Sequence, residues 1–282
     1  MKKNISKSRW QRLTIKIMGP IFILLLITIP LSAAETKNES IISYQPVREF
    51  FLDLRDVSLS PLRWEEKEWL TASLVVGTTV VLYNHDTLIL ESIQGKQNKF
   101  FTLVSRMVQP LGNGFYVLPS LAGVYLYGYS LKDQQMMENV GLCMKSYLLS
   151  SSLVQMMKLT GHRHRPNTGD PYNTWDGPGF YFENLSFPSG HSAGAFSLAS
   201  VLATIYREKK YVPALVYGLA GLTAISRIYD NMHWPSDVFF GSALGYFSGK
   251  AVMALDDKHK DLVIVPTLPG PDQYGFSLLY HF

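Results

Sequence analysis

The sequence contains the segment Lys158-Leu-Thr-Gly-His-Arg-His-Arg-Pro166, followed by Pro188-Ser-Gly-His191 and then by Ser226-Arg-Ile-Tyr-Asp-Asn-Met-His-Trp-Pro-Ser-Asp237. Among the residues of these three segments are three cationic side chains, two histidines, one carboxylate and a Ser-Gly turn that we group as one candidate site. Such groups can hold a tetrahedral oxyanion and attack it. The residues concerned are Lys158, Arg165, Arg227, His191, His233 and Asp237.

The second segment forms a turn directly before the apolar stretch Ser192–Tyr206, for which we predict a helix. Backbone N–H groups at a helix N-terminus point outward toward an anion, and Gly190 lets the backbone approach that anion closely. His191, at the start of the helix, can deliver or accept a proton beside it. The alternative interpretation is that this turn is only a helix cap.

The third segment places His233 and Asp237 four residues apart, and Pro235 indicates that a helix begins between them. Asp237 can then hydrogen-bond one imidazole nitrogen, which fixes the tautomer and leaves the other nitrogen as a nucleophile. A pair at this spacing also arises by chance. Arg227, at the end of the preceding predicted helix, adds a bidentate donor suited to phosphate oxygens.

The first segment follows a predicted helix at residues 136–159, with Lys158 in its last turn and Gly161 at its end. Lys158 and Arg165 can neutralise charge that builds on phosphate oxygens during phosphoryl transfer. Basic residues at helix ends also commonly meet only solvent and the helix dipole.

The first segment contains three further basic residues, His162, Arg163 and His164. His162 and His164 have no cysteine or carboxylate partner at metal-ligand spacing, so we expect them to support the site or to face solvent. Arg163 either adds to phosphate binding or faces solvent.

Taken together, the patterns K-x6-RP, PSGH and SR-x5-H-x3-D resemble the full three-part signature of the type-2 phosphatidic acid phosphatase superfamily. That group includes lipid phosphatases, bacterial acid phosphatases and vanadium haloperoxidases. The resemblance implies an all-α helical bundle in which His233 attacks phosphorus to form a phosphohistidine, Asp237 orients His233, and His191 transfers protons. It also implies a phosphate site that needs no metal or other cofactor. The phosphate-binding residues implied are Lys158, Arg165, Ser189, Gly190 and Arg227.

The N-terminus carries six Lys or Arg residues before the uncharged apolar run Ile17–Ala34. Residues 1–34 are therefore either a signal peptide cleaved after Ala34 or an uncleaved membrane anchor, and both export the remainder to the bacterial cell envelope. Without these six, the 26 basic residues of the chain become 20, against 22 acidic residues, a net charge of −2. A nucleic-acid partner is not expected.

No linker or repeat divides the rest of the chain, so we expect one main domain. Residues 35–69 form an amphipathic lead-in, residues 70–257 the helical phosphatase domain, and residues 258–282 a tail with a short β-hairpin. The long segment between Arg165 and Phe187 is predicted to be a functional loop or lid. The helices expected in the domain besides those above are Leu70–Tyr83, Phe115–Tyr129, Tyr211–Ile225 and Val238–Leu255.

The apolar runs are slightly short for the roughly 30 Å hydrocarbon core of a bilayer, so the sequence leaves open whether the helical body crosses a membrane. The favoured function is hydrolysis of a phosphomonoester or diphosphate of a membrane lipid, at the inner membrane with the site on the periplasmic side. The alternatives are a soluble periplasmic acid phosphatase and, less favoured, a vanadate-dependent haloperoxidase. Intact His191, His233 and Asp237 argue against a non-catalytic protein on this scaffold. The sequence specifies neither the individual substrate nor the oligomeric state.

Overall fold

The computed structural model of the protein describes the backbone of residues 45–267 and 275–280, and the side chains of residues 50–256. The predicted leader, residues 1–34, lies outside the described residues.

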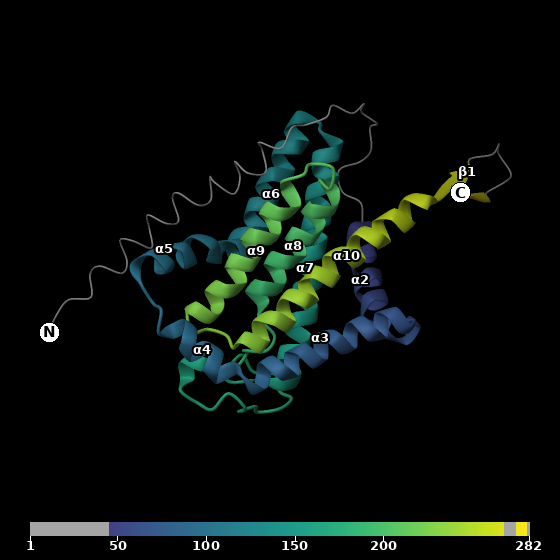
Figure 1. Cartoon of the computed structure of the whole chain (residues 1–282). Coiled ribbons are helices and arrows are strands. Elements are labelled where there is room, and N and C mark those ends of the chain that lie inside the picture. Colours follow the sequence, from purple (N-terminus) through teal and green to yellow (C-terminus); the bar gives the residue numbers. More distant parts are fainter. Residues whose placement is uncertain (1–44, 268–274, 281–282) are drawn as a thin grey trace.

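The described chain is a bundle of helices, which confirms the predicted all-α class (Figure 1). Three of the elements, named η, are short 3-10 helices. The elements in chain order are α2 (Gln45–Ser58), η1 (Ser60–Arg63), α3 (Glu66–Asn84), α4 (Asp86–Gln94), α5 (Lys99–Val108), η2 (Gln109–Gly112), α6 (Gly114–Leu131), α7 (Gln134–Gly161), η3 (Pro166–Thr168), α8 (Gly190–Ile205), α9 (Val212–Tyr229) and α10 (Pro235–Asp261).

Two strands follow α10, β1 (Leu262–Thr267) and β2 (Gly275–Tyr280), and they pair antiparallel with Leu262 opposite Tyr280. They occupy the part of the chain where the sequence predicts a hairpin. The residues between them, 268–274, lie outside the described residues.

Helix α8 lies at the centre of the bundle and packs against α7, α9 and α10 (Figure 1). The face that α10 turns toward α8 carries Gly241, Gly245 and Gly249, one turn apart. A Cβ added at Gly241 or Gly245 would overlap the backbone of Ser189 or Ala193 in α8. These glycines allow the two backbones to approach closely, and they bring the N-terminus of α10 beside that of α8.

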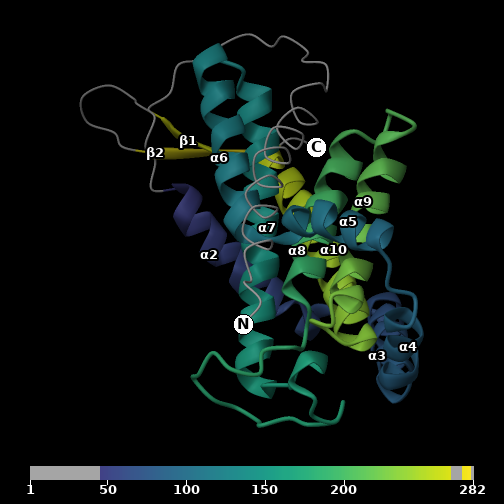
Figure 2. The ribbon, with the colours of Figure 1, turned by 90° about the vertical axis from the view of Figure 1, so that its left-hand side faces the viewer.

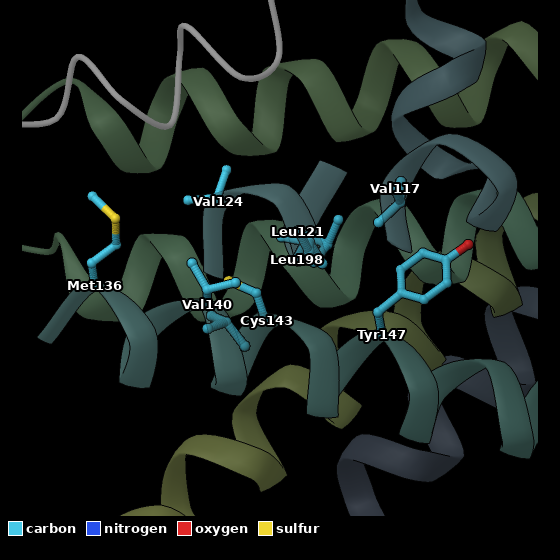
Figure 3. Packing of buried hydrophobic residues seen from close by; sticks show 9 residues of the cluster. Val117, Leu121, Val124, Met136, Val140, Cys143, Tyr147 and Leu198 are labelled. Carbon is cyan, nitrogen blue, oxygen red and sulfur yellow. The ribbon is translucent and has the colours of Figure 1, made fainter. Parts of the chain in front are cut away.

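The largest apolar cluster lies between α6, α7 and α8 (Figure 3). It includes Cys143, the single cysteine of the chain, which is buried. Burial of this cluster joins α6 to the helices that carry the signature segments. Its buried members are Val117, Leu121, Val124, Met136, Val140, Cys143, Tyr147, Leu198 and Val201.

Helix α7 ends at Gly161 as predicted, but His162 rather than a glycine adopts the left-handed conformation after it, with φ of 47°. The glycine at position 161 serves another purpose, because a Cβ there would lie 2.8 Å from the Trp175 ring. It makes room for the loop that follows, residues 162–189, which contains only the short helix η3 and reaches α8. We call this segment the 162–189 loop.

Two helices, α4 and α5, occupy the Lys- and Gln-rich stretch for which the sequence predicts no element. Helix α5 has an N-cap at Asn98, whose side chain accepts from the amide of Phe101. Helix α4 continues from α3 after a sharp bend of 65° at His85, and this bend places Asp86 inside the protein.

Among the described helices, α9 and α10 are long and apolar enough to cross a membrane, and α3 with α4 would add a third span if the bent pair counts as one. Several helices also expose large apolar side chains, including Leu74 and Val80 on α3, Phe115 on α6, and Ile225 on α9. Exposed apolar surface on this scale is typical of contact with lipid or with a partner.

Candidate active site

The three signature segments meet at one end of the bundle, where the 162–189 loop closes over the ends of α7 and α9 and the beginnings of α8 and α10 (Figures 1 and 2). Hydrogen bonds join the segments directly. Trp234 Nε1 donates to the carbonyl of His164 at 2.9 Å, and the amide of Ser189 donates to the carbonyl of Asp237 at 3.0 Å. The structure therefore brings together residues that lie far apart in the chain.

His233 and Asp237 lie where the third segment predicts them, on the turn before α10 and in its first turn. His233 Nδ1 is 3.7 Å from Asp237 Oδ2, which is longer than a hydrogen bond. This nitrogen is buried and has no hydrogen-bond partner in the described part of the chain. The predicted contact is thus present as a close approach, of the kind that often tightens only when substrate is bound.

The Asp237 carboxylate is held by groups that the sequence did not indicate. Its Oδ1 accepts from Arg163 Nη1 at 2.6 Å, and its Oδ2 accepts from the Ser186 hydroxyl and from the amide of Trp234 at 2.9 Å. Asp237 is completely buried, and these bonds fix which oxygen faces His233.

Both expectations for Arg163 are wrong. Its side chain is completely buried, and all five of its N–H groups are donated to protein acceptors, so it neither faces solvent nor has a donor left for phosphate. The guanidinium also lies over the Tyr83 ring, 4.6 Å from its centroid.

His191 is the second residue of α8 and is half-buried. Its Nε2 lies 3.3 Å from Nε2 of Gln109 in η2, a residue that the sequence reasoning did not single out. Helix η2 approaches so closely that a Cβ added at Gly112 would overlap the backbone of His191. The turn Gln109-Pro-Leu-Gly112 therefore forms one wall of the site, and its Gly-Pro content was the available signal.

The three predicted phosphate-binding cations are engaged by the protein to different degrees. Lys158, buried in the last turn of α7, donates to the carbonyl of Leu185. Arg227 pairs with Asp230 through one nitrogen and with the Ser226 hydroxyl through Nε. Arg165, in contrast, makes no side-chain hydrogen bond to any residue within the described ranges, so its donors are open to an anion.

Ser189 acts as the N-cap of α8, which the alternative interpretation of its segment predicts. Its hydroxyl oxygen accepts from the Ser192 hydroxyl at 2.9 Å. Because a serine hydroxyl can also donate one hydrogen bond, capping leaves its proton available. The amides of Gly190 and His191 lie in the first turn of α8, where backbone N–H groups lack intrahelical acceptors. Capping and anion binding are therefore compatible here.

Burial is the main cause that lowers the pKa of His233 to about 4. Asp237 acts in the opposite direction, whereas the positive charges of Lys158 and Arg165 lower the pKa further. The imidazole is consequently neutral near pH 7, as a nitrogen nucleophile requires.

The two other histidines of the first segment both contact residues of the 162–189 loop. His162 is completely buried, stacks on Tyr181, and lies within hydrogen-bond distance of the carbonyls of Gly177 and Tyr181. His164 lies between two carboxylates, Asp170 at 2.7 Å and Asp176 at 2.9 Å. Its hydrogen bond with Asp170 raises the pKa of His164. Both histidines support the loop.

The aromatic residues of this loop divide into two groups. Tyr172 packs against Tyr83 and Trp234, and Trp175 donates a hydrogen bond to the Tyr83 hydroxyl. Phe180 and Phe182 instead are 96% and 82% exposed. The first group fastens the loop to α3, and the second leaves an apolar tip on its surface.

Residues 140–261 match the model of the PAP2 superfamily. This match covers less than half of the chain. The matched region contains every site residue that the sequence predicts, whereas Gln109 and Asp86 come from the part of the chain before it. The C-terminal strands lie beyond it.

The chain is also similar to named phosphatases and to a solved structure. The chain is 28% identical over 181 residues to a lipid A 1-phosphatase of Porphyromonas gingivalis, covering 62% of this chain but only 36% of that relative. It is 38% identical over 87 residues to phosphatidylglycerophosphatase B of Bacillus subtilis, covering 27% of this chain and 42% of that protein. The crystal structure of Aquifex aeolicus LpxE is similar with a TM-score of 0.45 and 25% identity, over 60% of this chain and 94% of the other.

Proposed function

We propose that this protein is a phosphatase that hydrolyses a phosphate ester or diphosphate of a membrane lipid through a phosphohistidine on His233. The observation that carries the proposal is the convergence of the three signature segments around a buried His233 whose Nδ1 faces a fixed Asp237 carboxylate. A neutral imidazole oriented in this way presents its other nitrogen, Nε2, as the nucleophile.

In the first step, His233 Nε2 forms a bond to phosphorus while the bond from phosphorus to the ester oxygen breaks. His191 gives its proton to the departing oxygen, and Asp237 stabilises the positive charge on His233. In the second step, His191 takes a proton from water, whose oxygen attacks phosphorus and breaks the N–P bond. The products are inorganic phosphate, the restored His233 and the leaving group, which is the alcohol from a phosphate ester and the lipid monophosphate from a diphosphate.

The phosphate oxygens would be bound by Lys158, Arg165 and Arg227, with the Ser189 hydroxyl and the Gly190 amide completing the site. Cations that are already in place around an oxyanion stabilise the charge that develops in the transition state without reorganisation. Arg165 makes no side-chain hydrogen bond within the described ranges, so all of its donors are proposed to be available for phosphate.

A lipid substrate is supported by three observations. Two helices are long and apolar enough to cross a membrane, the tip of the 162–189 loop exposes Phe180 and Phe182, and the relatives named above carry lipid phosphatase names. With the basic N-terminal end on the cytoplasmic side, the site would lie on the periplasmic side of the inner membrane.

The test is phosphate release by the full chain in detergent with EDTA, from a lipid phosphate and from a soluble ester. We expect turnover of the lipid, lost by at least about a thousandfold in His233→Ala. Arg207→Ala is the control variant, because Arg207 is exposed between α8 and α9 and pairs with the neighbouring Glu208. Equal turnover of the soluble ester would favour an acid phosphatase of broad specificity, and full activity of His233→Ala would overturn the assignment of the nucleophile.

A further inference from the structure

A buried chain of charges connects the bend between α3 and α4 to the proposed nucleophile. Arg163 donates from Nη1 to Asp237 Oδ1 and from Nη2 to Asp86 Oδ2, at 2.6 and 2.7 Å. The three side chains are all fully buried, and each charge meets an opposite charge. Removing Arg163 would leave two carboxylates buried without their cation, which is strongly unfavourable.

We infer that Arg163 and Asp86 are positioning residues for the proposed phosphoryl transfer, because they hold the Asp237 carboxylate with its Oδ2 toward His233. The inference rests on the proposed function. Neither residue belongs to the three-part signature: Arg163 lies between Lys158 and Arg165, and Asp86 lies outside the PAP2 match.

Arg163 has the geometry for this role because its planar guanidinium serves both carboxylates at once. The same Nη1 that reaches Asp237 also donates to the Ser236 hydroxyl at 2.8 Å, and the backbone carbonyl of Tyr172 accepts from Nη2 and Nε. With all five donors used, the guanidinium cannot turn, and the carboxylate that it binds cannot turn either.

Asp86 completes the arrangement from the other side. Its Oδ1 accepts from the amide of Ser236 at 2.8 Å, and its Oδ2 accepts from the Ser236 hydroxyl at 2.6 Å. A carboxylate at this place meets unpaired N–H groups in the first turn of α10 and favours that end of the helix. The sharp bend at His85 thus brings a carboxylate from α4 to the helix that carries Asp237.

A positioning role predicts a specific change in kinetics. Arg163→Lys keeps the positive charge but cannot bridge two carboxylates, so kcat should fall about 10- to 100-fold through misplacement of His233. KM should stay within about twofold of the wild-type value, because Lys158, Arg165 and Arg227 are unchanged.

The role also predicts opposite shifts in the acid limb of kcat/KM. The charged or titratable groups around His233 are Asp237 on α10, Lys158 on α7, Arg165 on the 162–189 loop, His191 on α8 and Arg227 on α9. Asp86→Asn removes a negative charge behind Asp237 and should move the limb to lower pH. Arg163→Gln removes a positive charge and should move it to higher pH, each by about one unit.

The double variant Asp86→Asn/Arg163→Gln separates charge from geometry. Its cluster has the wild-type net charge, so the acid limb should return to its wild-type position while kcat stays low. Asp53→Asn is the matched control for loss of a buried ion pair, since Asp53 is 2% exposed and pairs with Lys145 across α2 and α7. Lys145 lies 13 residues from Lys158 on α7, about 20 Å along the helix. This control should change neither kcat nor the limb.

The titration of His233 followed by NMR, with its signal assigned by loss in His233→Gln, gives the same test without turnover. Opposite shifts in the two single variants and their cancellation in the double variant would support the inference. Shifts in the same direction, or none, would overturn it whether or not phosphate is released. Absence of phosphate release by the wild-type protein would instead overturn the proposed function.

Discussion

His233 and His164 each face an aspartate, yet the protein treats the two pairs in opposite ways. His233 is buried at 3% exposure beside Asp237, and burial lowers its pKa to about 4 despite the carboxylate. His164 lies near the surface of the 162–189 loop, where hydrogen bonds with Asp170 and Asp176 raise its pKa. At His233, desolvation and neighbouring cations lower the pKa by more than the single carboxylate raises it. At His164, which is only slightly desolvated, the two carboxylates raise the pKa by more than desolvation lowers it.

The two environments shift the pKa values of the two histidines in opposite directions. A neutral His233 keeps a lone pair for attack, whereas protonation allows His164 to donate to both of its carboxylates at once. One pair is therefore suited to chemistry and the other to holding the loop. Substitutions in the two pairs should therefore differ in their effect on catalysis.

Asp237→Asn should reduce kcat by about a thousandfold or more, because an amide cannot stabilise the charged imidazole and its N–H group disfavours the required tautomer. Asp176→Asn removes a carboxylate from the other pair and should leave kcat within about twofold. Steady-state phosphate release from one lipid substrate checks both variants. Equal losses in the two variants would contradict the division of roles.

The pH dependence of kcat/KM should show that His233 stays neutral well below its ordinary range. Protonation of Nε2 removes the nucleophile, so kcat/KM should fall about tenfold per pH unit on the acid side, with a midpoint below 6.5 and near 4. Measuring two esters whose phosphate groups have different pKa values distinguishes the titration of the enzyme from that of the substrate. An enzyme midpoint at or above 6.5 would show that burial does not control this histidine.

The contribution of His164 and its two carboxylates to the stability of the 162–189 loop should also depend on pH. Since the pKa of His164 is raised, its contribution to stability is complete below pH 6.5 and is lost as the pH rises through the higher folded value. The lowered pKa values of Asp170 and Asp176 mean that the carboxylates contribute above about pH 3.8 and lose their effect as the pH falls below it. The interaction of His164 with the two carboxylates therefore stabilises the loop most between these two pH limits.

Asp170→Asn should therefore bring the pKa of His164 back toward 6.5 and increase hydrogen exchange in the 162–189 loop by a few-fold at pH 6. An NMR titration of the histidines and hydrogen exchange followed by mass spectrometry measure the two effects. The His233 signal provides the internal control, because its titration should not change. Unchanged exchange in the loop would mean that the exposed pair does not hold it.

Much of this arrangement could be predicted from the sequence. The apolar runs placed the main helices, and Pro235 and the Ser-Gly turn placed the starts of α10 and α8, because these signals are local. The residues that hold the site could not be found in the same way. Asp86 lies 150 positions before Ser236, and no spacing rule connects a carboxylate at a helix bend to a distant helix N-terminus.

The role of Arg163 could not be predicted from the local sequence either. Its position between two predicted phosphate-binding residues suggested a shared role, but its environment depends on three aromatic rings and two carboxylates that come from other segments. Helices α4 and α5 were missed although both carry apolar residues at helical spacing and α5 has an N-cap at Asn98. These two helices carry local signals that the sequence prediction did not use.

The smallest effect concerns the tip of the 162–189 loop. If this loop serves the substrate rather than the chemistry, replacing Phe180 and Phe182 with serine should raise KM for a lipid phosphate in micelles by a few-fold and leave kcat unchanged. Both rings are exposed and lie outside the packed aromatic group, so the change should not lower the melting temperature. The soluble ester is the internal control, because it has no acyl chain to contact the rings. An equal rise in KM for both substrates would mean that the tip acts on the shape of the site and not on the lipid.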